Sequence, residues 1–292
     1  MSRKPIDVLI DQQKDWLDPL GKALVENVHH ARRAMGTRGA QVFDFLHGVW
    51  LGHPLHAAMT DLPVGAWTVG ALLDAVDTFA PSDALRRCAD GAILLGTLGG
   101  LAAAPAGTAD WHHTTGHARR VGLVHGLLNA ATLVLYTVSL ILRRGKARPL
   151  GVSLGVLGYS AATLSAYLGG ELAYRFGVGV DHTAWESAPK GFVPVLAEAE
   201  LRENEPRRAV ADGAAIVLVK RQGHIYALAE TCTHLGGPLS EGEVRDDVIV
   251  CPWHGSQFAL GDGSVVHGPA TFAEQSYDVR VRDGQVEVRP RR

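Results

Sequence analysis

Two long stretches without a charged residue constrain the fold of this chain more than any other feature. Residues 121–142 and 149–170 contain no Asp, Glu, Lys or Arg, and the cationic stretch 143–148 separates them. A helix needs about 20 predominantly apolar residues to span the hydrocarbon core of a bilayer. Two further stretches, the weaker of them interrupted by Asp74 and Asp77, extend the pattern. The expected transmembrane helices are residues 62–80, 91–109, 121–142 and 149–170.

The alternative to membrane helices is a soluble helical domain with buried helices. Two adjacent uncharged stretches of this length, divided by cationic residues, favour the membrane interpretation. Small residues four positions apart, such as Gly96 with Gly100 and Gly151 with Gly155, would let helices approach closely in lipid. No internal repeat is evident along the chain.

The segments on either side of the helices differ in composition. Residues 1–50 carry charges every few positions, which predicts an interfacial helical segment, and no apolar stretch near residue 1 indicates a cleavable secretory signal. After residue 174 the chain becomes polar and then alternates short β-like runs with turns. Asp283-Gly284 is a strong hairpin dipeptide between two such runs. The expected domains are residues 1–50, a four-helix transmembrane domain at 51–176, a linker at 177–190 and an all-β domain at 191–292.

The β-rich region contains a metal-binding pattern. Cys232-x-His234 is followed after 16 residues by Cys251-x-x-His254. Two thiolates and two imidazoles are the ligands of a Rieske-type [2Fe-2S] centre, and tetrahedral zinc accepts the same set. The single residue between Cys232 and His234, with Gly-rich loops after each pair, favours the iron-sulfur cluster. Only Cys88 remains as a third thiol, so no disulfide framework is expected.

Two loop sequences, CTHLGGPL and CPWHGSQF, resemble those of the Rieske family over about residues 190–292. Together with the expected membrane helices, this resemblance gives the expected fold class: a multi-domain protein in which an all-α four-helix transmembrane bundle precedes an all-β Rieske-type iron-sulfur domain. The resemblance to the Rieske family implies that Cys232 and Cys251 ligate the buried iron and that His234 and His254 ligate the outer iron. The residues expected around the cluster are Gly236, Gly237, Trp253, Gly255, Ser256, Phe258 and Pro269.

The loops differ from the quinol-oxidising bc-complex version of the family. That version joins its loops by a disulfide, and Gly237 and Trp253 occupy the corresponding positions here. Phe258 replaces a tyrosine that bonds near the cluster in that version, whereas Ser256 is retained. Fewer hydrogen bonds to the sulfurs stabilise the reduced state less. We therefore expect a ferredoxin-like reduction potential in the lower part of the Rieske range.

Histidines gather near one end of the expected helices. With four spans, both termini and the loop between the second and third helices share one membrane face, so the histidines lie on the side of the Rieske domain. An ionisable group within the hydrocarbon suggests a functional site, and two imidazoles can hold a haem iron axially. Hydrogen bonding between helices is the competing explanation. The candidate residues for a haem b or other metal are His53, His56, Asp110, His112 and His125.

The membrane half also resembles a family of bacterial membrane proteins of unknown function, often described as four-helix. The stretches HPLHAAMTDLPVGAW, GTADW and HGLLN carry this resemblance. It supports a fusion of two domains and supplies no biochemical role.

These patterns favour an integral protein of the bacterial cell membrane that carries single electrons, with the Rieske domain in the cytoplasm. Its expected partners are the bilayer and either a redox protein or a quinone. The net charge of −2 argues against nucleic acid binding. One alternative is a membrane oxidoreductase in which the cluster supplies electrons to a haem or non-haem metal among the histidines. Another is a transporter or sensor biased by cluster oxidation. Whether the chain is itself an enzyme stays open at this point.

Overall fold

The computed structural model describes residues 4–291, which divide into two compact units. Of the described residues, one unit comprises 4–39 and 55–178, and the other comprises 40–54 and 179–291. The boundary falls inside helix α3 (Thr37–His47), so a segment that precedes the long helices belongs to the β-rich unit. The sequence predicts a single linker at 177–190 and gives no sign of this second connection.

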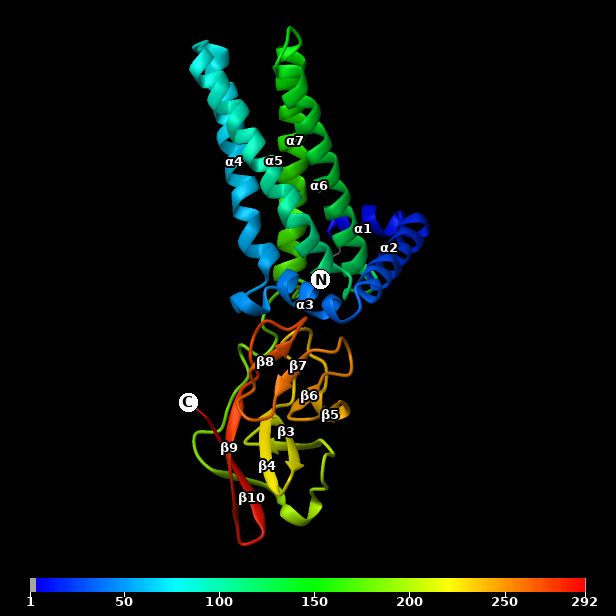
Figure 1. The fold of residues 1–292 in the computed structure, drawn as a ribbon, viewed down its shortest axis with the longest axis vertical. Coiled ribbons are helices and arrows are strands. Elements are labelled where there is room, and N and C mark those ends of the chain that lie inside the picture. The colour runs from blue at the N-terminus through cyan, green and yellow to red at the C-terminus, as the bar shows by residue number, and fades with distance from the viewer. Residues whose placement is uncertain (1–3, 292) are drawn as a thin grey trace. The chain divides into compact units, whose positions relative to one another are not determined.

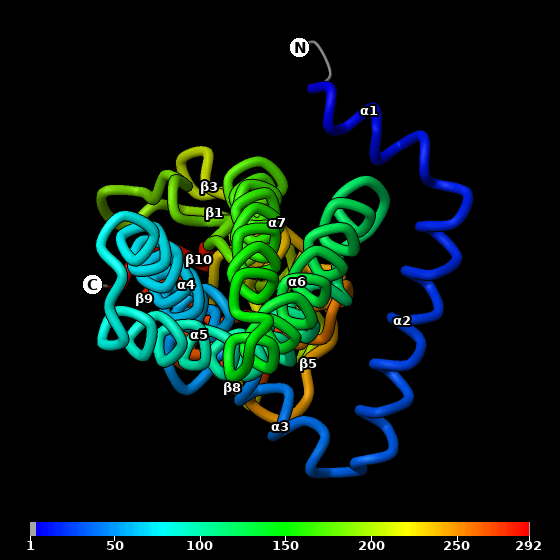
Figure 2. The backbone as a smooth tube through the Cα atoms, turned by 90° about the horizontal axis from the view of Figure 1, so that it is seen from above, coloured from blue at the N-terminus to red at the C-terminus, as the bar shows by residue number. Residues whose placement is uncertain are grey.

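The helical unit is built on four long antiparallel helices. They run side by side in Figure 1, and Figure 2 shows them almost end-on. Two shorter helices, α1 (Pro5–Gln12) and α2 (Lys14–Ala34), contact α6, where Ile10, Leu17, Val121, Leu123 and Leu168 form a buried cluster. The long helices are α4 (Leu55–Phe79), α5 (Asp83–Trp111), α6 (Gly116–Arg143) and α7 (Arg148–Tyr174).

Three helices in the described part of the chain, α5, α6 and α7, are long and apolar enough to cross a membrane. Of the four expected transmembrane helices, three are therefore supported by length and composition. The helix α4 is 25 residues long, but Asp61, Asp74 and Asp77 lower its hydropathy.

The two helical hairpins, α4–α5 and α6–α7, repeat one another. Residues of α4 meet their equivalents 69 positions later in α6: Trp67 stacks on Tyr136 with ring centroids 5.0 Å apart, and the carboxylate of Asp74 accepts hydrogen bonds from Arg143. In α5 and α7, the second helices of the two hairpins, equivalent residues are 62 positions apart. Gly96 of α5 lies against Trp67, and Gly158 of α7 lies in the same way against Tyr136. The amino-acid sequence shows no repeat because few of the equivalent residues are identical, and the equivalence lies in which positions pack together.

A buried ion-pair network connects all four long helices near the α4–α5 and α6–α7 turns. The Arg143 side chain is fully buried and donates to Asp74 and to Asp90 of α5, at 3.1 Å for the latter. Arg148 of α7 donates to Asp90 at 2.8 Å. Charges in a low-dielectric interior require such partners, because the cost of removing them from water is large.

The β-rich unit contains two antiparallel sheets. The six-stranded sheet has the order β1-β10-β9-β4-β3-β2, and the four-stranded sheet has the order β5-β6-β7-β8. The strands are β1 (Val193–Ala197), β2 (Arg207–Ala211), β3 (Ala214–Arg221), β4 (His224–Ala229), β5 (Glu243–Arg245), β6 (Val248–Val250), β7 (Gln257–Ala259), β8 (Val265–His267), β9 (Ser276–Arg282) and β10 (Gln285–Pro290).

Strand β3 separates two hydrophobic cores. Because successive side chains of a strand point to opposite faces, Ile216 and Leu218 enter one core while Val217 and Val219 enter the other. The second of these cores also contains Cys232 and Cys251. The expected hairpin at Asp283-Gly284 is confirmed, since β9 pairs with β10, and β3 pairs with β4 in a second hairpin.

The ion-pair network gives a prediction for stability. We expect Asp74→Asn to lower the unfolding temperature of the detergent-purified protein, because removing one partner of a buried ion pair costs about 3–5 kcal/mol. Since Asp90 still accompanies Arg143, the effect should fall toward the lower end. Asp83→Asn is the matched control, because Asp83 is 82% exposed and an exposed pair contributes little. Equal unfolding temperatures for both variants would contradict the prediction.

Candidate metal centre

Two loops of the β-rich unit have the same backbone hydrogen bonds. In the first, the Cys232 N–H donates to the Gly237 carbonyl at 2.8 Å, and the Gly236 N–H donates back to the Cys232 carbonyl at 2.9 Å. In the second, Cys251 donates to Ser256 at 2.8 Å and receives from Gly255 at 3.1 Å. In both loops a glycine stands four residues after the cysteine. The histidine stands two residues after Cys232 in the first loop and three residues after Cys251 in the second.

The glycines of these loops are required by their backbone conformation. Gly236 has φ +77° and Gly255 has φ +78°, in the left-handed region that residues with a Cβ rarely adopt. This explains from geometry why a glycine follows each cysteine-histidine pair.

The two cysteines meet inside the unit. Cys232 and Cys251 are 1% and 3% exposed, and their thiols share a hydrogen bond. That hydrogen bond lowers the pKa of the Cys251 thiol to about 7, whereas the same bond and burial raise the pKa of Cys232. The backbone N–H groups of Trp253 and His254 also donate to Cys251 and favour its thiolate. A thiolate is the form that binds a metal.

The two histidines meet nearer the surface. The rings of His234 and His254 have centroids 5.0 Å apart and lie at 90° to each other, and both side chains are half-buried. Burial lowers the pKa of His254, which favours the neutral ring that acts as a metal ligand. The loops therefore present two sulfurs inward and two imidazoles outward.

This arrangement fits a two-iron cluster. A Rieske centre takes two cysteines on one iron and two histidines on the other, so each iron has two protein ligands. Within residues 4–291, no three or more His, Cys, Asp or Glu side chains converge on one ion position. The donors present are paired by type, as the two irons of such a cluster require.

The residues expected around the cluster have identifiable roles in the structure. A Cβ on Gly237 would lie 2.8 Å from Cys251 Sγ and 3.1 Å from Trp253 Cγ, so the indole occupies the space that a side chain would need. Phe258 is fully buried. Pro269 follows a cis peptide bond in the loop after β8, and the hydroxyl of Ser256 accepts the N–H of Ala270 at 3.0 Å.

Two contacts of this unit were not anticipated from the sequence. Glu274 is 2% exposed, accepts the N–H of Thr233 at 2.8 Å, and has its pKa raised well above the usual range by burial. From the segment before the long helices, Asp44 accepts the Gly268 N–H at 2.9 Å and contacts His267 Nδ1 at 2.6 Å. A carboxylate 223 residues away in sequence offers no signal of such a contact.

The structure separates the histidines proposed for the helical unit. His56 and His125 lie together, with ring centroids 6.2 Å apart. His112 instead packs on His113 and His29, at centroid distances of 3.8 and 5.2 Å. His53 belongs to the β-rich unit and contacts Phe272. Asp110 lies near the end of α5.

Comparisons with known families match both units. Residues 191–278 match the family described as "Rieske [2Fe-2S] domain", and residues 52–182 match the family described as "Predicted membrane protein (DUF2231)". The second match agrees with the three helices that are apolar enough to span a membrane.

Curated relatives match the β-rich unit. Ferredoxin CarAc of Metapseudomonas resinovorans is 37% identical over 33% of this chain and 92% of its own length. The anthranilate 1,2-dioxygenase ferredoxin subunit of Burkholderia cepacia is 34% identical over 32% of this chain and 88% of its own length. Among solved structures, the ferredoxin of carbazole 1,9a-dioxygenase from Nocardioides aromaticivorans IC177 is 25% identical, with a TM-score of 0.33, over 35% of this chain and 100% of its own.

The paired loops agree with this similarity to iron-sulfur electron carriers, and the domain holds a [2Fe-2S] cluster. Through residues 191–278, the chain belongs to the Rieske [2Fe-2S] family.

Proposed function

We propose that this protein is a membrane-anchored Rieske ferredoxin that passes single electrons from a reductase or the quinone pool to an acceptor. The observation that carries the proposal is the pair of equivalent loops, which bring two sulfurs and two imidazoles together. We assign Cys232 and Cys251 to the inner iron, and His234 and His254 to the outer iron. The half-buried imidazoles form the path by which an electron leaves the cluster. The chain is then a carrier, since the cluster changes oxidation state without making bonds to substrate.

The helical unit supplies the anchor. Large apolar side chains of α5, α6 and α7 point outward, among them Leu98, Val134 and Leu157, each more than half exposed. In water such an apolar surface would be unfavourable, whereas in lipid it is the expected exterior.

We include α4 as a fourth spanning helix. Its outward residues are apolar, with Leu72 at 62% and Phe79 at 90% exposed. Its Asp74 is turned inward to Arg143, so its charge is neutralised inside the bundle. An intramembrane carboxylate paired in this way is tolerated.

The relatives suggest the kind of partner. The name of the Burkholderia cepacia relative describes a dioxygenase ferredoxin subunit. By analogy we favour a protein donor, with an oxygenase-type acceptor, over direct oxidation of quinol. The absence of a side chain at Gly237 and the Phe at 258 are consistent with this choice, because both depart from the quinol-oxidising version.

A redox titration tests the choice of donor. We expect a midpoint potential in the lower part of the Rieske range of about −150 to +300 mV, because few hydrogen bonds to the sulfurs stabilise the reduced state. The measurement is a potentiometric titration of the cluster's paramagnetic signal in detergent-purified protein. Added quinol should leave the cluster oxidised, whereas dithionite should reduce it. A potential near the top of the range, together with reduction by quinol, would assign the quinone pool as donor and refute our choice.

The space at Gly237 gives a prediction for cluster binding. We expect Gly237→Ala to lower the iron content and visible absorbance of the purified protein several-fold, because the new methyl group would collide with Cys251 Sγ and the Trp253 ring. Gly261→Ala is the matched control, since a Cβ there has no neighbour within 4 Å. Full cluster content in Gly237→Ala would show that the Trp253 ring moves freely and that the two loops are not closely packed.

The side of the membrane is tested by a fusion. We place both termini in the cytoplasm, where clusters are assembled. A reporter that is active only outside the cytoplasm, fused after Arg292, should therefore be silent, while a cytoplasmic reporter at the same position should be active. The opposite pattern would reverse the orientation without changing the assignment of the cluster.

A further inference from the structure

The repeated hairpins place two equivalent histidines against each other inside the helical unit. His56 of α4 and His125 of α6 are 69 positions apart, the same offset that relates Trp67 to Tyr136. Their ring centroids are 6.2 Å apart, and the ring planes are at 89°. Each first helix of a hairpin therefore contributes one imidazole to the interface between the hairpins.

Each ring is held by the second helix of its own hairpin. His56 Nδ1 lies 3.1 Å from the Ala103 carbonyl of α5, and His125 Nδ1 lies 2.8 Å from the Ser165 carbonyl of α7. One turn beyond each carbonyl stands a glycine. A Cβ on Gly107 would be 2.7 Å from the His56 ring, and a Cβ on Gly169 would be 3.2 Å from the His125 ring. Each hairpin therefore provides a backbone carbonyl that binds the ring and, one turn later, a glycine that leaves room for it.

These hydrogen bonds determine the tautomer of both rings. A carbonyl only accepts hydrogen bonds, so the proton of each neutral imidazole is on Nδ1 and the lone pair is on Nε2. The amide of Asn129 donates to His125 Nε2 at 3.1 Å, which agrees with a lone pair at that atom. Histidines that bind metal through one nitrogen usually donate from the other to a carbonyl or carboxylate, which orients the ring. Both rings are therefore in the form that a ligand requires.

The separation of the rings also fits shared coordination. With a metal–imidazole bond of about 2.0–2.1 Å and ~1 Å from nitrogen to ring centre, two rings on opposite sides of one metal have centroids about 6 Å apart. The observed separation is 6.2 Å. A tetrapyrrole supplies four nitrogens in its plane and needs two axial ligands from the protein, which is the number that the repeat provides.

We propose that His56 and His125 are the two axial ligands of one haem iron held between the α4–α5 and α6–α7 hairpins. Asn129 then turns its amide from His125 Nε2 to a neighbouring acceptor. This inference does not rest on the donor or acceptor of the Rieske cluster, and it gives the helical unit a one-electron centre of its own. His53, Asp110 and His112 are not part of this site.

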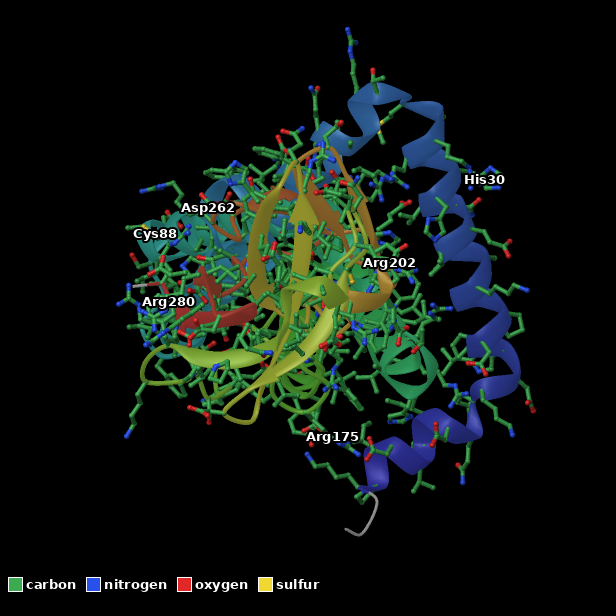
Figure 3. The ribbon with its side chains drawn as sticks, turned by 90° about the horizontal axis from the view of Figure 1, so that it is seen from below. His30, Cys88, Arg175, Arg202, Asp262 and Arg280 are labelled. Carbon is green, nitrogen blue, oxygen red and sulfur yellow. The ribbon has the colours of Figure 1, made fainter. Side chains whose placement is uncertain are left out.

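The test is haem binding by the full-length protein in detergent. Titration with haemin should saturate at one haem per chain and give the low-spin optical and paramagnetic spectra of two imidazole ligands. His56→Ala and His125→Ala should each weaken binding at least tenfold or convert the iron to high spin. His30→Ala is the matched control, because His30 is exposed on α2 (Figure 3), and it should bind haem as the unchanged protein does.

A second pair of variants separates ligation from packing. In His56→Gly and His125→Gly, added imidazole should restore the low-spin spectrum, which a merely structural histidine would not explain. Failure of the unchanged protein to bind haemin would overturn the proposal, and so would alanine variants that both bind haem with the affinity and spectrum of the unchanged protein. Histidine-dependent binding of Cu(I) or Zn²⁺ without haemin binding would also overturn the haem assignment. The Rieske signal of the same samples reports separately on the proposed electron carrier.

Discussion

The meeting of Cys232 and Cys251 inside the β-rich unit depends on how two loops close, and much of the unit serves that closure. Each loop is fixed by a reciprocal pair of backbone hydrogen bonds around a left-handed glycine. Strand β3 then contributes Val217 and Val219 to the core that contains the thiols. A metal centre of this kind needs its ligands in place before the metal arrives, and here the backbone supplies that order.

In the helical unit, the main constraint is that buried polar side chains need partners. In a low-dielectric interior, every polar side chain needs a partner, and the repeated hairpins let one half of the bundle supply partners for the other. Asp74 meets Arg143, and Trp67 meets Tyr136, at equivalent positions of the two halves. The same symmetry that neutralises a charge at one end of the bundle brings His56 and His125 together toward the other end.

Local chemistry was predictable from the sequence, and long-range pairing was not. The Cys-His spacing, the glycines after it and the Asp283-Gly284 turn act within a few residues, so their patterns predicted the loops and the hairpin. The repeat of the two hairpins is not visible in the sequence because it preserves the positions that pack together and not the residue types. Asp74 and Arg143, for example, occupy equivalent positions but carry opposite charges. Glu274 could have been noticed only as an acidic residue in a β-rich region, since nothing nearby in sequence reveals its burial or its bond to Thr233.

The contact between Asp44 and the loop containing Gly268 has a consequence for how the protein is made. Asp44 is synthesised long before Gly268, whose N–H donates a hydrogen bond to the Asp44 carboxylate. All four long helices are translated between these two residues. Closing so long a stretch of chain is slow compared with forming a local hairpin. The loop containing Gly268 should therefore acquire this contact late, after the four long helices have been synthesised. A fragment that begins at residue 191 would lack this contact altogether, although the rest of the Rieske domain would be present.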